Sequence, residues 1–255
     1  MATLSVTAVA QQKDTTANPY QREPGTIRIA SYNLHACSPS GSTEANYPNV
    51  IKAIGLIDSD YMALQELDSC NSRHNDYQAR ILGENTDMNY IFGKTIDYRG
   101  GAYGIGMLSR KKPISTAIIQ LPGKEPRAAI IAESDSLIFI STHLCVANDR
   151  NQVESFNILN RYAEEILKPK GKPILLAGDL NSTTLPDEAT SHWRILSTSE
   201  GTFWSKNSRI DYVLEYTGTD KPVQLVHAVL PAYPEIELRD VSDHLPIFID
   251  IRLPE

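Results

Sequence analysis

Residues 173–181 read PILLAGDLN, and residues 242–246 read SDHLP. The first stretch is an apolar run of strand length that ends in Asp179 and Asn181. In the second stretch, Asp243 and His244 stand directly before LPIFIDI, another apolar run of strand length. Both stretches therefore place acidic, amide or imidazole groups where a predicted strand ends or begins.

The same arrangement recurs along the chain. It is found at Asn33 after residues 27–32, Glu66 after 61–65, His143 after 137–142, and Asp211 within RIDYVL at 209–214. One Asp or Asn at a strand end is usually a turn residue. Segments separated by most of the chain nevertheless bring the same residue types to strand ends, which predicts a shared polar rim.

Outward from these segments, alternating β-branched runs predict about ten strands. They are residues 27–33, 61–65, 104–109, 114–121, 128–133, 137–142, 173–178, 210–215, 223–230 and 245–252. Helices are expected at 47–57, 77–82 and 151–167, the last with Val153, Phe156, Leu159, Ala163, Ile166 and Leu167 on one face. Many strands with few helices favour two packed sheets with helices outside.

Composition narrows the class of protein. The 255 residues are 41% hydrophobic and 22% charged, which is typical of one folded domain, expected at residues 26–255. The net charge of −7 argues against binding nucleic acid by bulk charge. No apolar run approaches the roughly 20 residues of a membrane span. Three cysteines without a CxxC pair exclude a disulfide scaffold, although a Cys37–Cys70 bridge stays open.

The amino-terminal residues differ from the rest. Residues 1–25 are expected to be disordered or the remnant of a signal peptide followed by a polar leader, outside the core. The small-x-small triplet Ala8-Val9-Ala10 is typical of a signal-peptidase site, which would make the protein periplasmic or secreted. The alternative is an ordinary terminus of a cytoplasmic protein.

The polar rim predicts metal chemistry. Carboxylates with an amide oxygen and no thiolate suit Mg²⁺, and also Mn²⁺ or Ca²⁺, better than zinc. Such an ion, an aligned water and an imidazole are the parts needed to hydrolyse a phosphate ester. The chain has no GxxxxGK[ST], HExxH, GxSxG or GxGxxG motif, so the corresponding functions lack their starting motif.

Seven segments in this order resemble the endonuclease/exonuclease/phosphatase superfamily of metal-dependent phosphoesterases. They are SYN (31–33), LQE (64–66), YGIGMLSR (103–110), STHL (141–144), GDLN (178–181), RIDYVL (209–214) and SDHLP (242–246). The resemblance extends from about residue 27 to residue 253. It implies an α/β fold, a four-layer α/β/β/α sandwich of two mainly antiparallel sheets, with the site at one sheet edge.

The resemblance also implies a role for each matching residue. Glu66 would be the main metal ligand, supported by Asn33 and Asp243. Asp179 would position or deprotonate the attacking water, and Asn181 would hold a phosphate oxygen. Asp211 would pair with His244 and favour its charged form, while His143 would donate to another phosphate oxygen. Tyr103 and Arg127 are candidates for phosphate contact, and water would attack directly in line with the leaving oxygen.

One departure from the family pattern concerns His35. Abasic-site endonucleases carry an acidic residue at this place and inositol phosphatases usually an Asn, so a second metal ligand is in doubt. The SYNLH form resembles an unassigned bacterial branch, in which His35 would be a substrate contact or a packing residue. His74, His192 and His227 have no motif around them and are expected to be structural or exposed.

The substrate class stays open. Residues 94–127 carry seven basic and two acidic residues, either as a solvated face or as a wall that attracts anions. A phosphodiesterase or phosphatase acting on small or lipid-derived esters is slightly favoured over a DNA or RNA nuclease. A non-catalytic phosphate-binding protein is a further alternative. The phosphate ester would be the partner of a protein that we expect to be monomeric, without a transmembrane segment.

Overall fold

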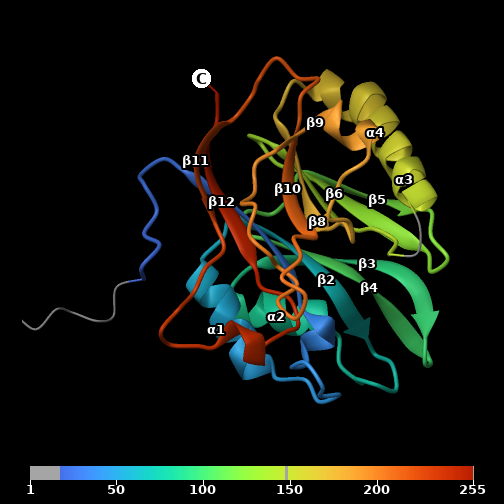
Figure 1. The fold of residues 1–255 in the computed structure, drawn as a ribbon, viewed down its shortest axis with the longest axis vertical. Coiled ribbons are helices and arrows are strands. Elements are labelled where there is room, and N and C mark those ends of the chain that lie inside the picture. The colour runs from blue at the N-terminus through green and yellow to red at the C-terminus, as the bar shows by residue number, and fades with distance from the viewer. Residues whose placement is uncertain (1–17, 147–148, 255) are drawn as a thin grey trace, which may run out of the picture.

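The computed structural model describes residues 18–146 and 149–254, which form two six-stranded sheets (Figure 1). The strands are β1 (Ile27–Asn33), β2 (Tyr61–Ser69), β3 (Asn89–Tyr98), β4 (Gly101–Ser109), β5 (Ser115–Leu121), β6 (Arg127–Glu133), β7 (Ile138–His143), β8 (Ile174–Asp179), β9 (Trp193–Ile195), β10 (Asp211–Tyr216), β11 (Gln224–Val229) and β12 (Ile247–Arg252). The first sheet has the order β11-β12-β1-β2-β4-β3, and the second has the order β5-β6-β7-β8-β10-β9.

Each sheet contains one parallel pair, β1 with β2 and β7 with β8, and its other pairs are antiparallel. The carboxyl ends of two parallel strands meet at the same edge of their sheet. Each sheet therefore presents two neighbouring carboxyl ends at one edge, and the polar residues named above lie there.

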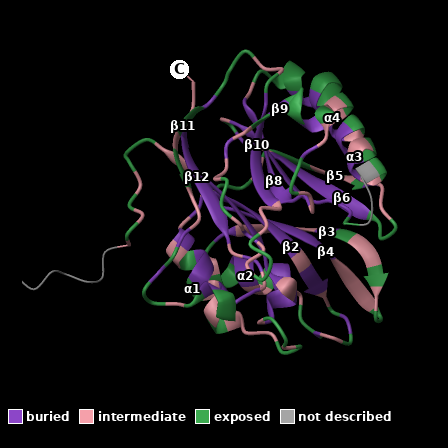
Figure 2. Ribbon diagram, in the orientation of Figure 1, coloured by how far each residue is buried: buried purple, intermediate pink, exposed green. Residues whose placement is uncertain are grey.

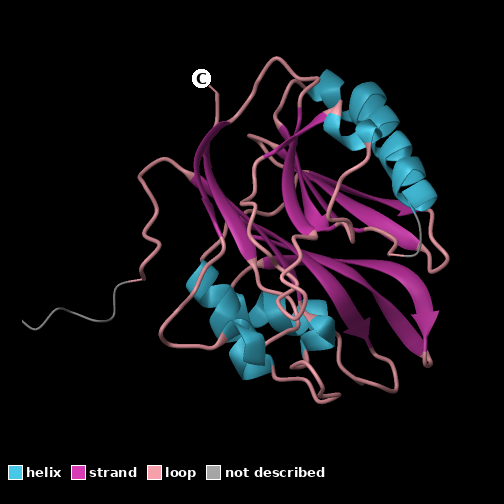
Figure 3. Cartoon of the chain, viewed as in Figure 1, coloured by secondary structure: helices cyan, strands magenta, loops and turns pink. Residues whose placement is uncertain are grey.

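The helices lie outside the stacked sheets, and Figure 3 shows them on either side of the strands. They are α1 (Tyr47–Ile57), α2 (Gln78–Thr86), α3 (Asp149–Tyr162) and α4 (Asp187–Thr190), with short 3₁₀ turns at His35–Cys37, Lys168–Lys170 and Leu238–Asp240 and a π-helical turn at Ala163–Leu167. The fold is thus the predicted four-layer sandwich.

Alternation along the strands builds three apolar layers. In β1, Ile29 packs between the sheets, whereas Ala30 and Tyr32 pack under α1 and α2. In the second sheet, Leu175 packs between the sheets and Leu176 packs under α3. Because successive side chains point to opposite faces, each strand supplies two layers. Figure 2 shows the central strands as the most buried part of the molecule.

The ten predicted strands are all present, with ends shifted by a few residues, and two strands were not predicted. The unpredicted β3 is an edge strand whose residues are mostly half-buried, so its sequence lacks a strict apolar alternation. The unpredicted β9 has only three residues. Both strands lie at sheet edges, where burial constrains the sequence least.

The predicted helix 151–167 was wrong in one detail. Phe156, Leu159, Ala163 and Leu167 are buried, but Ile166 is 47% exposed. The last turn, Ala163–Leu167, is π-helical. A π turn contains more residues than an α turn, which changes the direction of the side chains that follow. Ile166 therefore leaves the face predicted from a regular α-helix.

The expectation that residues 1–25 lie outside the core was wrong for their described part, residues 18–25. The Tyr20 ring packs edge-on against Tyr233 at 5.4 Å and Phe248 at 5.6 Å between centroids. Arg22 forms ion pairs with Asp58 and Asp60. One aromatic ring suffices to anchor a polar segment because it covers apolar surface. The triplet Ala8-Val9-Ala10 lies outside the described residues.

The sequence left a Cys37–Cys70 disulfide open and predicted no membrane-spanning segment. Cys37 is buried, Cys70 is exposed, and they do not form a disulfide. Within residues 18–146 and 149–254, no helix combines the length and the hydrophobicity that crossing a bilayer requires.

Candidate active site

Sheet register brings three of the predicted residues together. Asp179, the last residue of β8, lies opposite His143 in the parallel β7–β8 ladder. It also lies opposite Asp211 in the antiparallel β10–β8 ladder. Residues directly opposite in a ladder are close neighbours. Strand pairing therefore gathers two carboxylates and an imidazole at one edge of the second sheet.

Asn33 connects this group to the first sheet. Its Nδ2 donates hydrogen bonds to Glu66 Oε1 at 3.1 Å and to Asp179 Oδ2 at 3.0 Å. Its side-chain oxygen accepts a hydrogen bond from the backbone N–H of His35 at 3.1 Å. Asn33 is fully buried. The edges of the two sheets thus form one continuous polar rim.

Glu66 reaches the rim through a bulge in β2. The register of β2 against β4 shifts between Leu64 and Leu67, and Glu66 between them has a φ of 61°. A non-glycine residue in the left-handed region costs on the order of 1–3 kcal/mol and is typical of functional sites. The bulge redirects the Glu66 carboxylate toward Asn33.

His244 is held by Asp211 through a hydrogen bond of 2.9 Å between Nδ1 and Oδ2, the pairing expected from the sequence. Its ring also packs against Phe203 at 5.0 Å. Burial alone would lower the pKa of His244, but the charges of Asp211, Asp179 and Asp243 raise it to about 10. His244 is therefore an imidazolium at neutral pH, with Nε2–H facing Asp179.

Asp179 lies at the centre of the rim. Its Oδ1 accepts the backbone N–H of Asn181 at 2.8 Å, and its Oδ2 lies 3.7 Å from His244 Nε2. Burial, followed by repulsion from Asp211, raises the pKa of Asp179, while His244 opposes this shift. A carboxylate with a raised pKa is a stronger base than an exposed one.

His143 and Asn181 form a hydrogen-bonded pair beside Asp179, whose Oδ2 lies 3.5 Å from His143 Nε2. The Asn181 amide nitrogen donates to His143 Nε2 at 2.9 Å and to the Leu144 carbonyl at 3.0 Å. Burial, with the charges of Arg127 and His244, holds the pKa of His143 well below its usual range, so the ring is neutral. In this arrangement Asn181 uses its amide hydrogens within the protein, and His143 Nε2 accepts rather than donates.

Two sets of residues could hold a cation. One is the pair implied by the family resemblance, Glu66 with the half-buried Asp243. Glu66 is linked to Asn33 at 3.1 Å, and the neighbour of Asp243, Ser242, donates from Oγ to the Asn33 carbonyl at 2.7 Å. The other is Asp179, Asp211 and His244, whose polar atoms lie within 4.8 Å of one another. To bind a metal, the second set would require His244 to lose its proton.

The side chains of Tyr103, Arg127 and His35 lie beside the rim and, among the described residues, form no hydrogen bond with its side chains; only the backbone N–H of His35 does, to Asn33. Burial and the charge of Glu66 raise the pKa of Tyr103, while Arg127 and Arg73 oppose the shift. Arg127 is 6% exposed, pairs with Glu125, and has an Nε without a hydrogen-bond partner among the described residues. The His35 ring contacts the Ser38 carbonyl at 3.2 Å.

The basic segment 94–127 is not one wall. Arg99 lies in the β3–β4 turn and Arg127 begins β6, both at the end of the sheets where the rim lies. Arg110 and Lys111 follow β4 and lie at the opposite end, near the starts of β1 and β2. Of the two alternatives, a single anion-attracting wall is therefore excluded for the segment as a whole, although Arg99 and Arg127 lie at the rim end.

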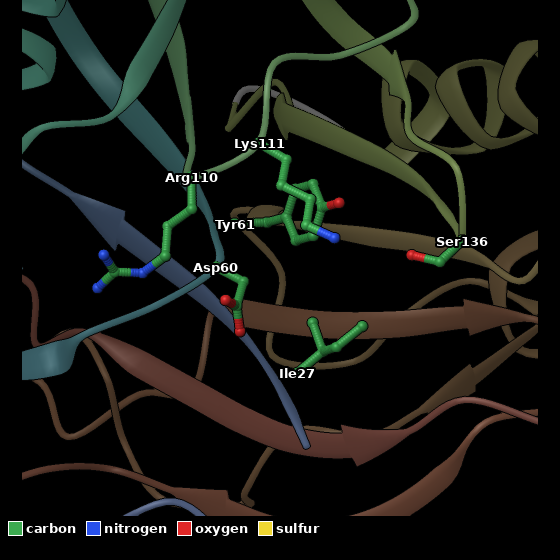
Figure 4. Close-up of a pocket in the computed structure, with 6 residues that line it drawn as sticks. All are labelled: Ile27, Asp60, Tyr61, Arg110, Lys111 and Ser136. Atoms are coloured by element: carbon green, nitrogen blue, oxygen red, sulfur yellow. The ribbon is translucent and has the colours of Figure 1, made fainter. Parts of the chain in front are cut away.

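A cavity of about 230 Å³ occupies that opposite end (Figure 4). It is lined by Ile27, Asp60, Tyr61, Arg110, Lys111 and Ser136. Ile27 and Tyr61 start the strands whose other ends lead to Asn33 and Glu66. Seven residues of strand separate the two ends by roughly 20 Å, so this cavity is not part of the rim.

Several residues at the rim were missed by sequence reasoning. Ser242 Oγ accepts the backbone N–H of His244 at 3.2 Å, and Thr202 Oγ1 accepts that of Asp211 at 3.2 Å. Ser242 lies within the quoted SDHLP segment, whereas Thr202 and Phe203 lie in a loop without a motif. Of the three histidines set aside, His74 is buried against Asp68 at 2.7 Å, whereas His192 and His227 are exposed.

The sequence profile of the Endonuclease/Exonuclease/phosphatase family matches residues 30–244. The chain belongs to this family. A comparison with curated protein sequences finds no significant match. Assignment to the family makes the chain a phosphoesterase- or nuclease-type hydrolase and agrees with the buried carboxylate and histidine group at the rim.

Solved structures of low sequence identity share this fold. One is the endonuclease/exonuclease/phosphatase from Bacteroides vulgatus, with a TM-score of 0.71 and 18% identity over 89% of this chain and 99% of that chain. Another is a Bacteroides thetaiotaomicron mannosyl-6-phosphatase, with a TM-score of 0.70 and 17% identity over 88% of this chain and 99% of that chain. A third is D. rerio TDP2 complexed with single-strand DNA product, with a TM-score of 0.64 and 17% identity over 89% of this chain and 99% of that chain.

Proposed function

We propose that the protein is a Mg²⁺-dependent phosphoesterase that hydrolyses its substrate by direct attack of a water activated at Asp179. The observation that carries this proposal is the hydrogen-bonded group Glu66–Asn33–Asp179, with the charged His244 on its other side. It joins a site for a cation, a base and an acid in one rim.

Glu66 and Asp243 would hold the metal. Both offer carboxylate oxygens, the ligands that Mg²⁺ prefers and that Mn²⁺ or Ca²⁺ also accept. When bound, the ion neutralises charge on a phosphate oxygen and on the leaving oxygen. Asn33 orients Glu66 through its amide nitrogen; its oxygen would become a ligand only with the carboxamide turned over.

Asp179 and His244 would divide the proton chemistry. Asp179, with its raised pKa, would accept the proton of the attacking water. His244 would donate a hydrogen bond from Nε2 to a phosphoryl oxygen as negative charge grows there, with Asp211 fixing the ring. Tyr103, Arg127 and His35 would contact the substrate farther out on the rim.

Asn181 would hold a phosphate oxygen by exchanging one internal hydrogen bond. A phosphate oxygen would replace His143 Nε2 as the acceptor of one amide hydrogen, while the bond to the Leu144 carbonyl stays. His143, released from accepting that hydrogen bond, would then carry its ring proton on Nε2 and donate to a second phosphate oxygen. This exchange makes Asn181 and His143 act together.

We favour a small or lipid-derived phosphate ester over DNA or RNA, because the basic residues of segment 94–127 are divided between two ends of the molecule. Proteins of this fold include a mannosyl-6-phosphatase and one complexed with single-strand DNA, so the fold fits both classes. The protein would act as a monomer, and as a periplasmic or secreted enzyme.

The test compares nicking of supercoiled plasmid with hydrolysis of bis(p-nitrophenyl) phosphate, each with Mg²⁺, with EDTA and with the His244→Ala variant. Ester turnover without nicking, abolished in both controls, is expected. Nicking abolished in both controls would make the protein a nuclease. Tight phosphate binding without turnover of either substrate would make it a non-catalytic binding protein and overturn the proposal.

A further inference from the structure

Beside the rim, Arg73 is fixed by a buried carboxylate. Its Nε and Nη2 donate to the two oxygens of Asp68 at 2.7 and 2.8 Å. The Asp68 side chain is fully buried and also contacts His74 Nδ1 at 2.7 Å. Bidentate charge-assisted pairs of this kind hold a guanidinium in one orientation. Arg73 keeps 24% of its side chain exposed, so it is held in place at the surface.

Asp68 and Tyr103 connect Arg73 to the catalytic rim. They lie opposite each other in the β2–β4 ladder, and Asp68 is two residues after Glu66. The guanidinium carbon of Arg73 lies 5.6 Å from the Tyr103 ring centre and 5.0 Å from that of Tyr98. Glu66 and Arg73 both influence Tyr103 electrostatically. Arg73 and Glu66, the carboxylate proposed to hold the metal, therefore both lie near Tyr103.

The loop that carries Arg73 is itself tied down. Asn71 Oδ1 accepts the backbone N–H groups of Arg73 and His74, at 2.9 and 3.1 Å. The backbone N–H of Ser72 donates to the carbonyl of Arg99 at 3.0 Å, which binds the loop to the β3–β4 turn. The position of the guanidinium is thus set before any ligand arrives.

One edge of the guanidinium remains open. A guanidinium has five N–H donors, and Asp68 takes the Nε edge. The Nη1–Nη2 edge is a second fork, and no acceptor for Nη1 is found among the described residues. The guanidinium carbon of Arg99 lies 5.2 Å from the ring centre of Tyr98, which Arg73 also approaches. Arg99 therefore adds a second positive charge beside Arg73. A fork of this shape matches the oxygens of a phosphate.

We propose that Arg73 binds a second phosphate of the substrate, beyond the one that is hydrolysed, and so makes the enzyme prefer esters that carry two phosphates. The second phosphate could come from the next nucleotide of a strand or from a small diphosphorylated ester. The proposal rests on the proposed function, because the first phosphate is the one hydrolysed at the rim. Tyr98 and Tyr103 would form the apolar floor between the two phosphates.

The experiment compares matched probes with one and two phosphates. Thymidine 5′-(p-nitrophenyl phosphate) is measured against its 3′-phosphorylated counterpart, and glucose 6-phosphate against glucose 1,6-bisphosphate. The quantity is the ratio of kcat/KM within each pair, which does not depend on the folded fraction. We expect a ratio of at least about 10 for one pair in the unaltered protein, as one charge-assisted bidentate contact provides.

The Arg73→Lys variant keeps the charge beside Asp68 and loses the fork, so the ratio should fall to below about 3. The matched control is Arg110→Lys, which alters an ion-paired arginine at the opposite end and should leave the ratio unchanged. A raised ratio for the thymidine pair assigns the second phosphate to a nucleic acid strand, and one for the glucose pair assigns it to a small ester. Ratios near one in both pairs, or an unchanged ratio in Arg73→Lys, would overturn the proposal.

A binding measurement separates this proposal from the proposed function. Thymidine 3′,5′-bisphosphate should bind at least about 10-fold more tightly than thymidine 5′-phosphate by calorimetry, and Arg73→Lys should remove the difference. If no probe is turned over but this difference is present, the proposed function fails and the second phosphate site stands. If the probes are turned over, the two affinities are equal and the kcat/KM ratio of the glucose pair is also near one, only the phosphate site fails.

Discussion

The positive charge of His244 is stabilised by carboxylates on different segments of the chain. Asp211 contacts it directly and Asp179 lies 3.7 Å away, so its pKa rises to about 10 although burial opposes the shift. A raised pKa in the folded state contributes stability that is fully present below the unfolded value, near about 6.5. That contribution is lost as the pH rises through about 10.

Replacing Asp211 by Asn tests this pairing. The amide can still accept a hydrogen bond from His244, but the negative charge is gone, so the pKa of His244 should fall. We expect kcat at neutral pH to drop by about 10²- to 10⁴-fold, and the alkaline limb of the pH–rate profile to move to lower pH. An unchanged profile from about pH 5 to about pH 10 would show that Asp211 does not set the charge.

For single residues, the sequence predicts which types meet at the rim, because each rim residue stands at the end of a recognisable strand. It does not predict how their hydrogen bonds are shared. The donation by Asn181 to His143, and by Asn33 to two carboxylates, depends on the distance between the strands that carry them. Arg73 was missed because its importance comes from Asp68 and Tyr103, which only the β2–β4 register brings together.

Among the elements, β7 and β8 approach closely just before the rim. A Cβ atom on Gly178 would lie 2.0 Å from the Thr142 carbonyl oxygen. Gly178 precedes Asp179, and Thr142 precedes His143. The spacing of these two strands therefore determines how far apart the two functional side chains lie.

The Gly178→Ala variant should force β7 and β8 apart. We expect a loss of about 1–3 kcal/mol in the free energy of unfolding, and a loss of ester hydrolysis in the fraction that remains folded. Gly55→Ala in α1 is the matched control, since no atom lies within 4 Å of its added Cβ, and it should stabilise by about 0.5–1 kcal/mol. Equal unfolding midpoints for the two variants in denaturant would contradict the close approach.

Strands were predictable where burial requires a run of apolar or β-branched residues, as in β1 and β8. The ten strands recognised from alternation form the centres of the two sheets and two of their edges. The edge strand β3, the short β9 and the π-helical turn at Ala163–Leu167 were not recognised, because little burial or an irregular turn weakens the periodic signal. The β2 bulge was also invisible, although it positions Glu66.

In the whole molecule, the two ends of the stacked sheets differ in character. One end holds the carboxylates, amides and histidines of the rim, with Arg73 and Arg127 beside them. The other end holds the cavity at Ile27 and Tyr61 with Arg110 and Lys111. Since β1 and β2 run in parallel from one end to the other, strand direction alone separates the two.

In the proposed function, Glu66 holds a metal on which hydrolysis depends. The most direct test titrates Mg²⁺ into EDTA-treated protein while following hydrolysis of bis(p-nitrophenyl) phosphate, for the unaltered chain and for Glu66→Gln. We expect a saturable rise in rate for the unaltered chain and a rate at least about 100-fold lower for Glu66→Gln, at a similar unfolding temperature. Hydrolysis that persists without added metal, or an equal rise in Glu66→Gln, would contradict the claim.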